Sequence, residues 1–190
     1  VIGAGVAGTE AIKKAVASGA YVKIIDLSEE KLKQLQQRFG EDKIEYIIST
    51  PETITEALAC SDLVIGSVYV VGKEAPKVIT KEMISKMKPG SVVVDIAIDQ
   101  GGCIETSRPT THDDPVFMHD NVIHYCVSNM PGAVPLTATL ALNKATMPFI
   151  EMLTKEGINK ALEHEKHLAN GLNIRDGEVT HPAIKEALGL

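Results

Sequence analysis

The sequence predicts an α/β fold in which a doubly wound parallel sheet is followed by C-terminal helices. Short runs rich in Val and Ile alternate with amphipathic helical segments, which is typical of a parallel sheet covered on both faces. Six such runs are present, and the fourth begins a second half, as in doubly wound folds built from two halves. After Pro131 the strand pattern stops. We therefore expect a sheet domain over residues 1–130 and a helical segment over residues 131–190.

Each expected strand is a short apolar run, and we place the strands at residues 1–2, 21–26, 43–49, 62–68, 89–97 and 121–127. The helices between them have start and stop signals. Ser28 can cap the helix that Gly40 ends, and Pro51 takes the first position of the next helix, where its missing amide hydrogen costs nothing. Further helices are expected at residues 6–18 and 80–88.

The C-terminal segment has a mainly helical pattern. Residues 135–169 are expected to be helical, with Pro148 kinking or breaking the run. Residues 173–188 are expected to form a small turn and a last helix.

Composition excludes several classes of protein. Nineteen basic and 25 acidic side chains give a net charge of −6 without any Lys/Arg cluster, which argues against a nucleic-acid partner. No apolar run approaches the roughly 20 residues that cross a bilayer. Cys60, Cys103 and Cys126 are widely spaced and odd in number, which argues against a disulfide framework and a zinc knuckle. We expect a cytoplasmic protein with no membrane partner and no metal.

Gly3, Gly5 and Gly8 form a G-x-G-x-x-G pattern between the first strand and the first helix. In this context Gly3 permits a tight turn, Gly5 lets the backbone approach a pyrophosphate, and Gly8 brings the helix close to the sheet. The free amides at the helix start, including those of Val6 and Ala7, would then face the phosphates. The alternative is a glycine-rich turn that serves packing alone.

Asp26 strengthens the case for a dinucleotide, because it ends the second strand 18 residues after Gly8. A carboxylate there can accept hydrogen bonds from both hydroxyls of an adenosine ribose. Its charge would repel a 2′-phosphate, so the expected cofactor is NAD rather than NADP. The alternative is a turn residue at a strand end. Lys31, one helical turn further along, could reach the adenosine side or lie solvated on the surface.

Three long loops punctuated by Gly and Pro follow the fourth, fifth and sixth strands, where the nicotinamide lies in such folds. Their sequences are SVYVVGKEAPKVIT, DIAIDQGGCIETSRPTTHDDP and VSNMPGAVPLTATLAL. Loops of this kind often carry functional residues. Asp99, just past the fifth strand, can hold an amine or a hydrolytic water and assist proton transfer. The alternative interpretation is that Asp99 caps the Gly101-Gly102 turn.

The chain resembles the alanine dehydrogenase / NAD(P) transhydrogenase alpha-subunit family over essentially its whole length. The resemblance runs from GAGVAG through SDLVIGSV and KPGSVVVDIAIDQGGCIETSRPTTHDDP to HYCVSNMPGAVPLTATLALNKAT. The segment with DQGG and RPTTHDDP is most similar to the alanine dehydrogenases. Saccharopine dehydrogenases that form lysine share the general layout. The resemblance implies a Rossmann fold and a reversible reaction in which L-alanine, NAD⁺ and water give pyruvate, ammonium and NADH.

The resemblance also implies residue roles. Asp99 would be the active-site carboxylate beside nicotinamide and substrate. Cofactor contacts carried over from the family fall on Asp26, Lys31, Ser49, Val68, Tyr69, Ile96, Ala97, Ile98, Asp99, Arg108, Val127, Ser128, Asn129 and Met130. The apolar members would pack against rings, and Asn129 could bond the carboxamide. The family implies a homo-oligomer, commonly a hexamer. It places its substrate arginine and lysine and its catalytic histidine in a domain before the glycine loop, toward which residues from about 131 would pack.

Other polar residues have simpler explanations. The group His112, Asp113 and Asp114 is expected to shape a turn, and His124 to be a satisfied histidine within a strand. His164 and His167 are expected on a solvated helix face, and Cys103 is not expected to act as a nucleophile. Two rival functions stay open. One is a non-catalytic NAD(H)-binding module of the transhydrogenase type, and the other is a related amino-acid or opine dehydrogenase.

Overall fold

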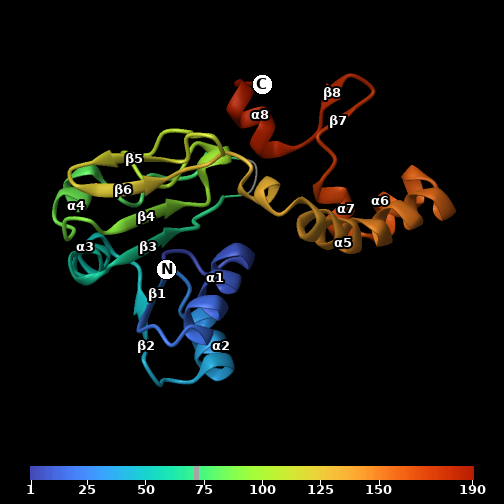
Figure 1. The fold of residues 1–190 in the computed structure, drawn as a ribbon. Helices are drawn as coiled ribbons and strands as arrows, with labels where there is room; N and C mark the ends of the chain where they lie inside the picture. Colours follow the sequence, from blue (N-terminus) through green and yellow to red (C-terminus); the bar gives the residue numbers. More distant parts are fainter. Residues whose placement is uncertain (71–72) are drawn as a thin grey trace. The chain divides into compact units, whose positions relative to one another are not determined.

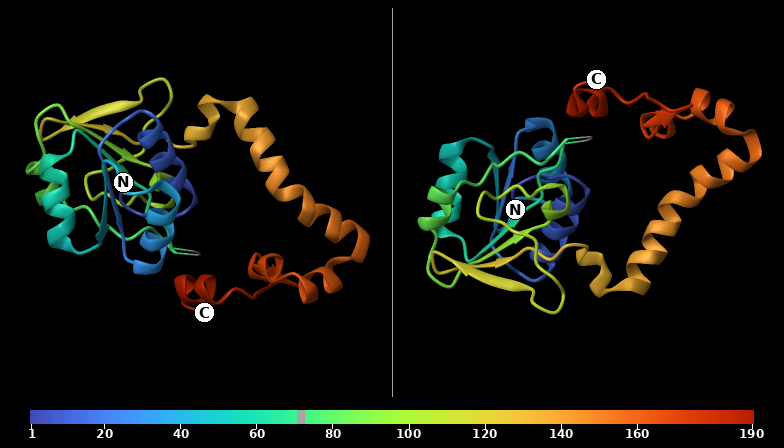
Figure 2. Two further views of the ribbon diagram at one scale, coloured as in Figure 1. Left: turned by 90° about the horizontal axis from the view of Figure 1, so that it is seen from below. Right: turned by 90° about the horizontal axis from the view of Figure 1, so that it is seen from above.

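The computed structural model describes residues 1–70 and 73–190, which form two compact units, Val1–Met130 and Pro131–Leu190 (Figures 1 and 2). The predicted loop SVYVVGKEAPKVIT includes Val71 and Gly72, which lie outside the described residues. Within the described ranges, no helix is both long enough and apolar enough to cross a membrane.

The first unit is built on a mostly parallel sheet with the order β2, β1, Ile2, β3, β4, β6, β5 (Figure 1). The strands are β1 (Val22–Asp26), β2 (Ile44–Ile48), β3 (Leu63–Gly66), β4 (Val92–Asp95), β5 (Val116–His119) and β6 (Val122–Tyr125). Neighbouring strands run parallel except for β5, which is antiparallel to β6. This order is that of a doubly wound α/β sheet, so the predicted fold class is confirmed.

Ile2 joins the two halves of the sheet. It forms parallel bridges with Ile25 of β1 and with Gly66 of β3. Its amide donates to the carbonyl of Ile65 at 2.9 Å, and the amide of Gly3 donates to the carbonyl of Ile25 at 2.8 Å. The segment expected as a strand at residues 1–2 therefore lies between the two halves. The glycine loop that follows it lies where the strand order reverses, which is where doubly wound sheets bind ligands.

Four helices accompany these strands: α1 (Val6–Ala17), α2 (Glu29–Phe39), α3 (Pro51–Cys60) and α4 (Lys81–Ser85). The starts of α2, α3 and α4 are capped by the hydroxyls of Ser28, Thr50 and Thr80, each of which accepts a backbone amide three residues ahead. Helix α4 is shorter than the predicted 80–88. Pro89 disfavours helical backbone at the residue before it, and the chain leaves the helix by a tight turn.

Alternation along β1 explains how helices cover both faces of the sheet. Ile24 points to one face, where it packs with Ile12 of α1 and Leu32 of α2. Ile25 points to the opposite face, where it joins a cluster that includes Leu58 of α3 and Ile84 of α4. All six side chains are at most 4% exposed. Two apolar layers therefore hold the sheet and fix the loops at its carboxyl edge.

Two strand predictions need correction. Strand β4 covers only Val92–Asp95 of the expected 89–97, because the Asp95 carboxylate accepts the amide of Ala97 and turns the chain. Strand β5 was not predicted. It pairs with β6 through a tight turn at Asp120 and Asn121, whose φ values of 48° and 60° are those of a hairpin turn.

The second unit consists of α5 (Pro135–Glu156), α6 (Ile158–His164), α7 (Lys166–Asn170), the two-stranded pair β7 (Ile174–Arg175) and β8 (Glu178–Val179), and α8 (Pro182–Leu188). Helix α5 continues through Pro148, so of the expected kink or break, the break is wrong. A proline removes a single helical hydrogen bond, and the turns on either side hold the helix together. The expected turn and last helix over residues 173–188 are present, with β7 and β8 forming the arms of the turn.

Candidate cofactor crevice and active site

A cavity of about 790 Å³ lies at the carboxyl edge of the sheet, around the glycine loop and the ends of β1 to β4. The predicted site residues that line it are Gly3, Gly5, Val6, Ala7, Asp26, Lys31, Ser49, Val68, Tyr69, Ile96 and Ala97. They come from both halves of the sheet. The fold thus brings most of the predicted adenosine and phosphate contacts into one crevice.

The glycine loop has no room for side chains at two of its three glycines. A Cβ on Gly3, whose φ is +91°, would lie 2.7 Å from the carbonyl oxygen of Ser67, and one on Gly8 would lie 1.9 Å from the carbonyl oxygen of Gly3. A Cβ on Gly5 would meet nothing within 4 Å. Gly3 and Gly8 are therefore required by the protein itself. Gly5 faces open space in the crevice, so any demand for glycine there comes from a ligand.

Asp26 organises the turn that borders the crevice. Its Oδ2 accepts the amide of Ala4 at 2.7 Å, and its Oδ1 accepts the amide of Ser28 at 2.9 Å. Its side chain is 10% exposed, and the ammonium of Lys31 lies 4.0 Å from Oδ2. A carboxylate offers about four acceptor positions, so two backbone bonds leave capacity for ligand hydroxyls. Asp26 can therefore hold the turn and accept hydrogen bonds from a ligand at the same time.

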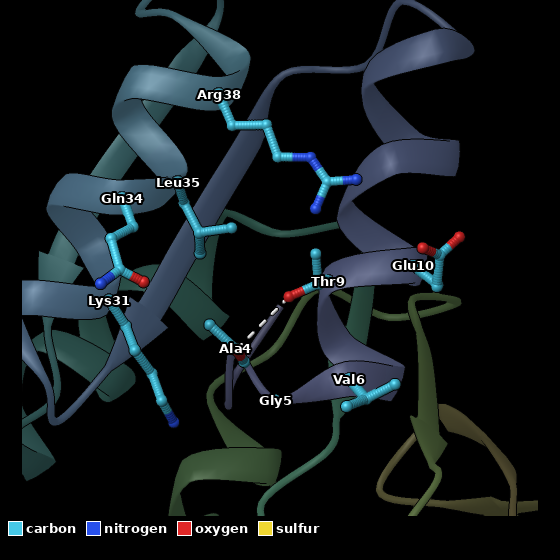
Figure 3. A pocket seen from close by; sticks show the side chains of 9 residues that line it. All are labelled: Ala4, Gly5, Val6, Thr9, Glu10, Lys31, Gln34, Leu35 and Arg38. Atoms are coloured by element: carbon cyan, nitrogen blue, oxygen red, sulfur yellow. Dashed lines mark hydrogen bonds between the residues drawn. The ribbon is translucent and has the colours of Figure 1, made fainter. Parts of the chain in front are cut away.

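A second cavity, of about 680 Å³, runs between α1 and α2 (Figure 3). It shares Gly5, Val6 and Lys31 with the crevice. Figure 3 shows the Lys31 side chain reaching down beside the glycine loop, while Arg38 extends from α2 toward α1. The hydroxyl of Thr9 donates to the carbonyl of Ala4 at 3.4 Å. Lys31 therefore stands where the two cavities meet.

Asp99 lies at the other end of the site, in a short 3-10 turn over Ile98–Gln100. Both of its carboxylate oxygens accept the amide of Asn129, at 3.1 and 3.3 Å. Asn129 has a φ of 53°, a left-handed conformation that turns its amide toward Asp99. The loops after β4 and β6 are thus joined by a hydrogen bond that links two predicted site residues.

Several predicted contacts do not line the crevice of this unit. They are Gly8, Ile98, Asp99, Arg108, Val127, Ser128, Asn129 and Met130. Gly8, Ile98 and Val127 are buried in the protein. The Arg108 guanidinium lies over the ring of Phe117, 4.2 Å from its centre. The amide of Ser128 donates to the carbonyl of Thr110. In this structure these residues pack or support loops, and Asp99 and Asn129 form an exposed pair.

The simpler explanations for two buried groups agree with the structure. His124 is fully buried, with Nε2 2.7 Å from the Thr106 hydroxyl and Nδ1 3.1 Å from the Val122 carbonyl. Burial lowers its pKa. Cys103 is also fully buried, and burial together with the charge of Asp95 raises its pKa to about 12. Such a thiol is a poor nucleophile.

The acidic turn and the C-terminal histidines also follow expectation. The amide of Asp114 donates to the hydroxyl of Thr111, while Nε2 of His112 lies 3.1 Å from the carbonyl of Asn129. His164 is exposed and pairs with Glu156 at 3.2 Å. These contacts are those of turn and surface residues.

Comparison with known proteins identifies the family. The profile of the alanine dehydrogenase/PNT C-terminal domain matches residues 1–182. The chain belongs to this family. Among curated relatives, alanine dehydrogenase of Halomonas elongata is 50% identical over 190 residues, which is 100% of this chain and 51% of that protein. Alanine dehydrogenase of Bacillus subtilis (strain 168) is 48% identical over 100% of this chain and 50% of its own length.

Solved structures of the alanine dehydrogenase/PNT family have the same fold. An L-alanine dehydrogenase superposes with a TM-score of 0.84 and 45% identity, covering 99% of this chain and 52% of that one. A transhydrogenase from Sinorhizobium meliloti gives a TM-score of 0.73 and 30% identity, over 96% and 48% of the two chains. The chain therefore spans about half the length of the relatives it matches.

Ser67 and Gln100 are among the residues that line the crevice but were not predicted. Ser67, which is 9% exposed, donates from its hydroxyl to the carbonyl of Gly3 at 2.6 Å and holds the glycine loop against the end of β3. Gln100 follows Asp99 in the sequence and also lines the crevice. The signal for Ser67 was its place right after a buried strand. Gln100 stood in the conspicuous DQGG segment.

Proposed function

We propose that the protein containing this chain is an NAD-dependent L-alanine dehydrogenase, and that residues 1–130 form its cofactor-binding domain. The reaction is the reversible oxidative deamination of L-alanine to pyruvate and ammonium. The observation that carries the proposal is the crevice in which the uncapped start of α1 and the carboxylate of Asp26 lie side by side. Helix-start amides suit phosphates, and a strand-end carboxylate suits a ribose.

The residues present fit NAD. A Cβ at Gly5 meets only open space, so the backbone of the glycine loop is free to approach a pyrophosphate closely. The amides of Val6 and Ala7 at the start of α1 would hold the phosphates, and Ser49 and Lys31 would border the adenosine. Val6, Leu27 and Tyr69 are 89%, 79% and 56% exposed along the crevice, and such apolar surface favours packing against ligand rings.

Asp26 supports the choice of NAD over NADP. Its carboxylate already accepts two backbone amides, and the remaining acceptor positions suit two ribose hydroxyls. A phosphate on the 2′ position would place like charges next to each other. Lys31, 4.0 Å away, offsets part of this charge. Asp26 therefore selects against NADP without excluding it entirely.

Asp99 would serve the chemistry at the other end of the site. When bound, the nicotinamide would supply hydride transfer to and from the substrate α-carbon. The Asp99 carboxylate is exposed and held by the amide of Asn129, so its oxygens keep a fixed direction. They would orient the substrate amine or a water, and accept a proton from the attacking water. Ile96, Ala97 and Ile98 would pack near the ring, with Val127, Ser128 and Met130 on the loop that carries Asn129.

The remainder of the activity would come from outside this chain. Its relatives are about twice as long, and we propose that the further domain supplies the groups that bind the substrate carboxylate and the catalytic histidine. We propose that residues 131–190 pack toward that domain. Helix α5 is suited to this because Leu136, Leu140 and Leu142 are 74%, 62% and 65% exposed. A cytoplasmic homo-oligomer, a hexamer by family resemblance, completes the proposal.

The test is a spectrophotometric assay of the complete protein with NAD⁺ and a panel of L-amino acids. We expect NADH formation with L-alanine, and the reverse reaction with pyruvate and ammonium. NADP⁺ should support a much lower kcat/KM. Activity confined to another amino acid would replace alanine as the substrate, and would favour a related amino-acid or opine dehydrogenase.

A second candidate is a non-catalytic NAD(H)-binding module, favoured by the 30% identity to a transhydrogenase structure. It predicts tight NADH binding by the complete protein without turnover of any amino acid. The same assay, combined with NADH fluorescence titration, separates the two functions.

A further inference from the structure

The most deeply buried charged side chain of the candidate site region is Asp95, at the carboxyl end of β4. It is 0% exposed, and no ion pair to it is found among the described residues. Its carboxylate accepts backbone amides instead. Oδ1 accepts those of Ala97 at 3.1 Å and Cys103 at 3.2 Å, and Oδ2 accepts that of Ile104 at 3.1 Å. Burying a carboxylate is costly, so this arrangement calls for an explanation.

These hydrogen bonds close the chain between Ala97 and Ile104 into a small loop. The amide of Gly102 donates to the carbonyl of Ala97 at 2.9 Å and closes the loop a second time. A Cβ on Gly102 would lie 2.8 Å from Oδ2 of Asp95, so the loop is packed directly on the carboxylate. The Lys77 ammonium, from the preceding loop, donates to the carbonyls of Gly101 and Gly102.

The loop that Asp95 closes carries the functional end of the site. Ala97 and Gln100 line the crevice, and Asp99 lies between them in sequence. The Asp99 carboxylate in turn accepts the amide of Asn129 from the loop after β6. Asp95 is therefore hydrogen-bonded to both ends of the segment that carries Asp99, and Asp99 is hydrogen-bonded to Asn129 of the neighbouring loop.

We propose that Asp95 is a positioning residue for the reaction, which sets the place of Asp99 by anchoring both ends of the loop that carries it. The inference rests on the proposed function, since it concerns the carboxylate that would handle the substrate. Asp95 itself contacts neither substrate nor cofactor. Three amides converging on one carboxylate fix the loop more tightly than a neutral side chain can, because hydrogen bonds to charged acceptors are the stronger ones.

The principal test is Asp95→Asn in the complete protein. The side-chain amide nitrogen would face the amide of Ile104 instead of accepting from it, so the loop loosens at one end. We expect kcat for alanine oxidation to fall about 10- to 100-fold, as misplacement of a reacting group by about 1 Å can cost 100-fold. The Kd for NADH should change less than about threefold, because the glycine loop and Asp26 are untouched.

A double-mutant cycle with Asp99→Asn separates positioning from general weakening. If Asp95 acts through Asp99, the double variant is no slower than Asp99→Asn alone. If the two losses multiply, Asp95 does not act through Asp99 and the proposal is overturned. Asp62→Asn is the matched control, because Asp62 is exposed and pairs with Lys88 at 3.0 Å, and it should leave kcat unchanged.

A milder variant covers the case in which Asp95→Asn does not fold. Cys103→Ala deletes the thiol that contacts Oδ1 at 3.5 Å and leaves all three amides in place. We expect a loss in kcat of about two- to fivefold that disappears in the Asp99→Asn background. A loss that persists in that background overturns the proposal.

Hydrogen exchange separates failure of this proposal from failure of the proposed function. If the unmodified complete protein turns over no amino acid, the proposed function is wrong, and positioning is judged from the amide of Asn129. That amide should exchange faster in Asp95→Asn, or in Cys103→Ala, than in the unmodified protein. Unchanged exchange at Asn129 would show that Asp99 keeps its place without Asp95.

Discussion

The two ends of the candidate site, the glycine loop and the segment that follows β4, satisfy their backbone amides in opposite ways. At the glycine-loop end, α1 starts at Gly5 without a side-chain cap among the described residues, and its first turn has no acidic side chain. At the other end, Asp95 accepts three amides and Asp99 accepts that of Asn129. The first end leaves donors for a ligand, whereas the second satisfies its donors within the protein.

The start of α1 differs from the other helix starts in the same unit, because α2, α3 and α4 all begin at capping hydroxyls. The amides of an uncapped helix start suit an anion, so that end keeps backbone donors for a ligand. The other end is assembled in advance. A catalytic carboxylate needs such preorganisation, because its direction must hold through the reaction. We therefore predict that substitutions at the glycine-loop end weaken cofactor binding. Substitutions at the end with Asp95 and Asp99 should instead slow turnover of the substrate.

The largest effect is expected for Asp99→Asn in the complete protein. The change preserves size but removes the proton acceptor, so kcat should fall about 100- to 10,000-fold, the range typical of lost general acid–base catalysis. NADH affinity, measured by fluorescence titration, should stay nearly constant. Asp113→Asn, a change to a nearby exposed carboxylate, is the control and should have little effect. A large loss of NADH affinity in Asp99→Asn would remove the distinction between the two ends.

The glycine loop offers a matched pair of variants, Gly5→Ala and Gly8→Ala. Both should abolish measurable NADH binding, because a methyl group at Gly5 occupies the phosphate approach and one at Gly8 displaces the loop. Only Gly8→Ala meets protein, with its Cβ 1.9 Å from the Gly3 carbonyl oxygen. It should lower the free energy of unfolding by about 1–3 kcal/mol, as overpacking does. Equal thermal stability of the two variants would contradict this reading of the loop.

Asp26→Ala should have a smaller effect at the same end. Hydrogen bonds to charged groups contribute about 1.5–3 kcal/mol, so NAD⁺ affinity should fall at least about tenfold. Affinity for NADP⁺ should rise, since the repelling charge is gone and Lys31 becomes available to a phosphate. Glu45→Ala, at an exposed position of β2, is the control. If the unmodified protein binds both cofactors equally, Asp26 does not select between them.

The sequence predicted the fold well because its signals were local. The start signals at Ser28 and Pro51, and short apolar runs alternating with amphipathic segments, placed nearly every strand and helix of residues 1–130. Strand β5 was missed since its only signal was the short turn at Asp120 and Asn121. The expected break at Pro148 was wrong, because one missing amide hydrogen did not interrupt the 22-residue helix α5.

The site was predictable where a motif with fixed spacing specified backbone geometry, as in the glycine loop and Asp26. The role of Asp95 was not, because nothing in VVVDIAIDQGG distinguishes a buried carboxylate that accepts three amides from one that faces solvent. Family resemblance carried over Arg108 and Val127, and this structure shows one stacked on Phe117 and the other buried. Whether they meet a cofactor stays a prediction.

The smallest expected effect is a pH dependence of the free energy of unfolding that comes from His124. Burial lowers the pKa of His124 below its ordinary value of 6.5, so the unfolded chain binds the proton more readily than the folded one. The contribution of His124 to stability is complete above about pH 6.5 and is lost as the pH falls below it. Urea unfolding between about pH 7.5 and about pH 5 should show this decline, and His124→Gln should reduce its slope.

The exposed His167, changed to Gln, should leave the slope as it is. If His124→Gln also leaves the slope unchanged, His124 is not the source of the decline.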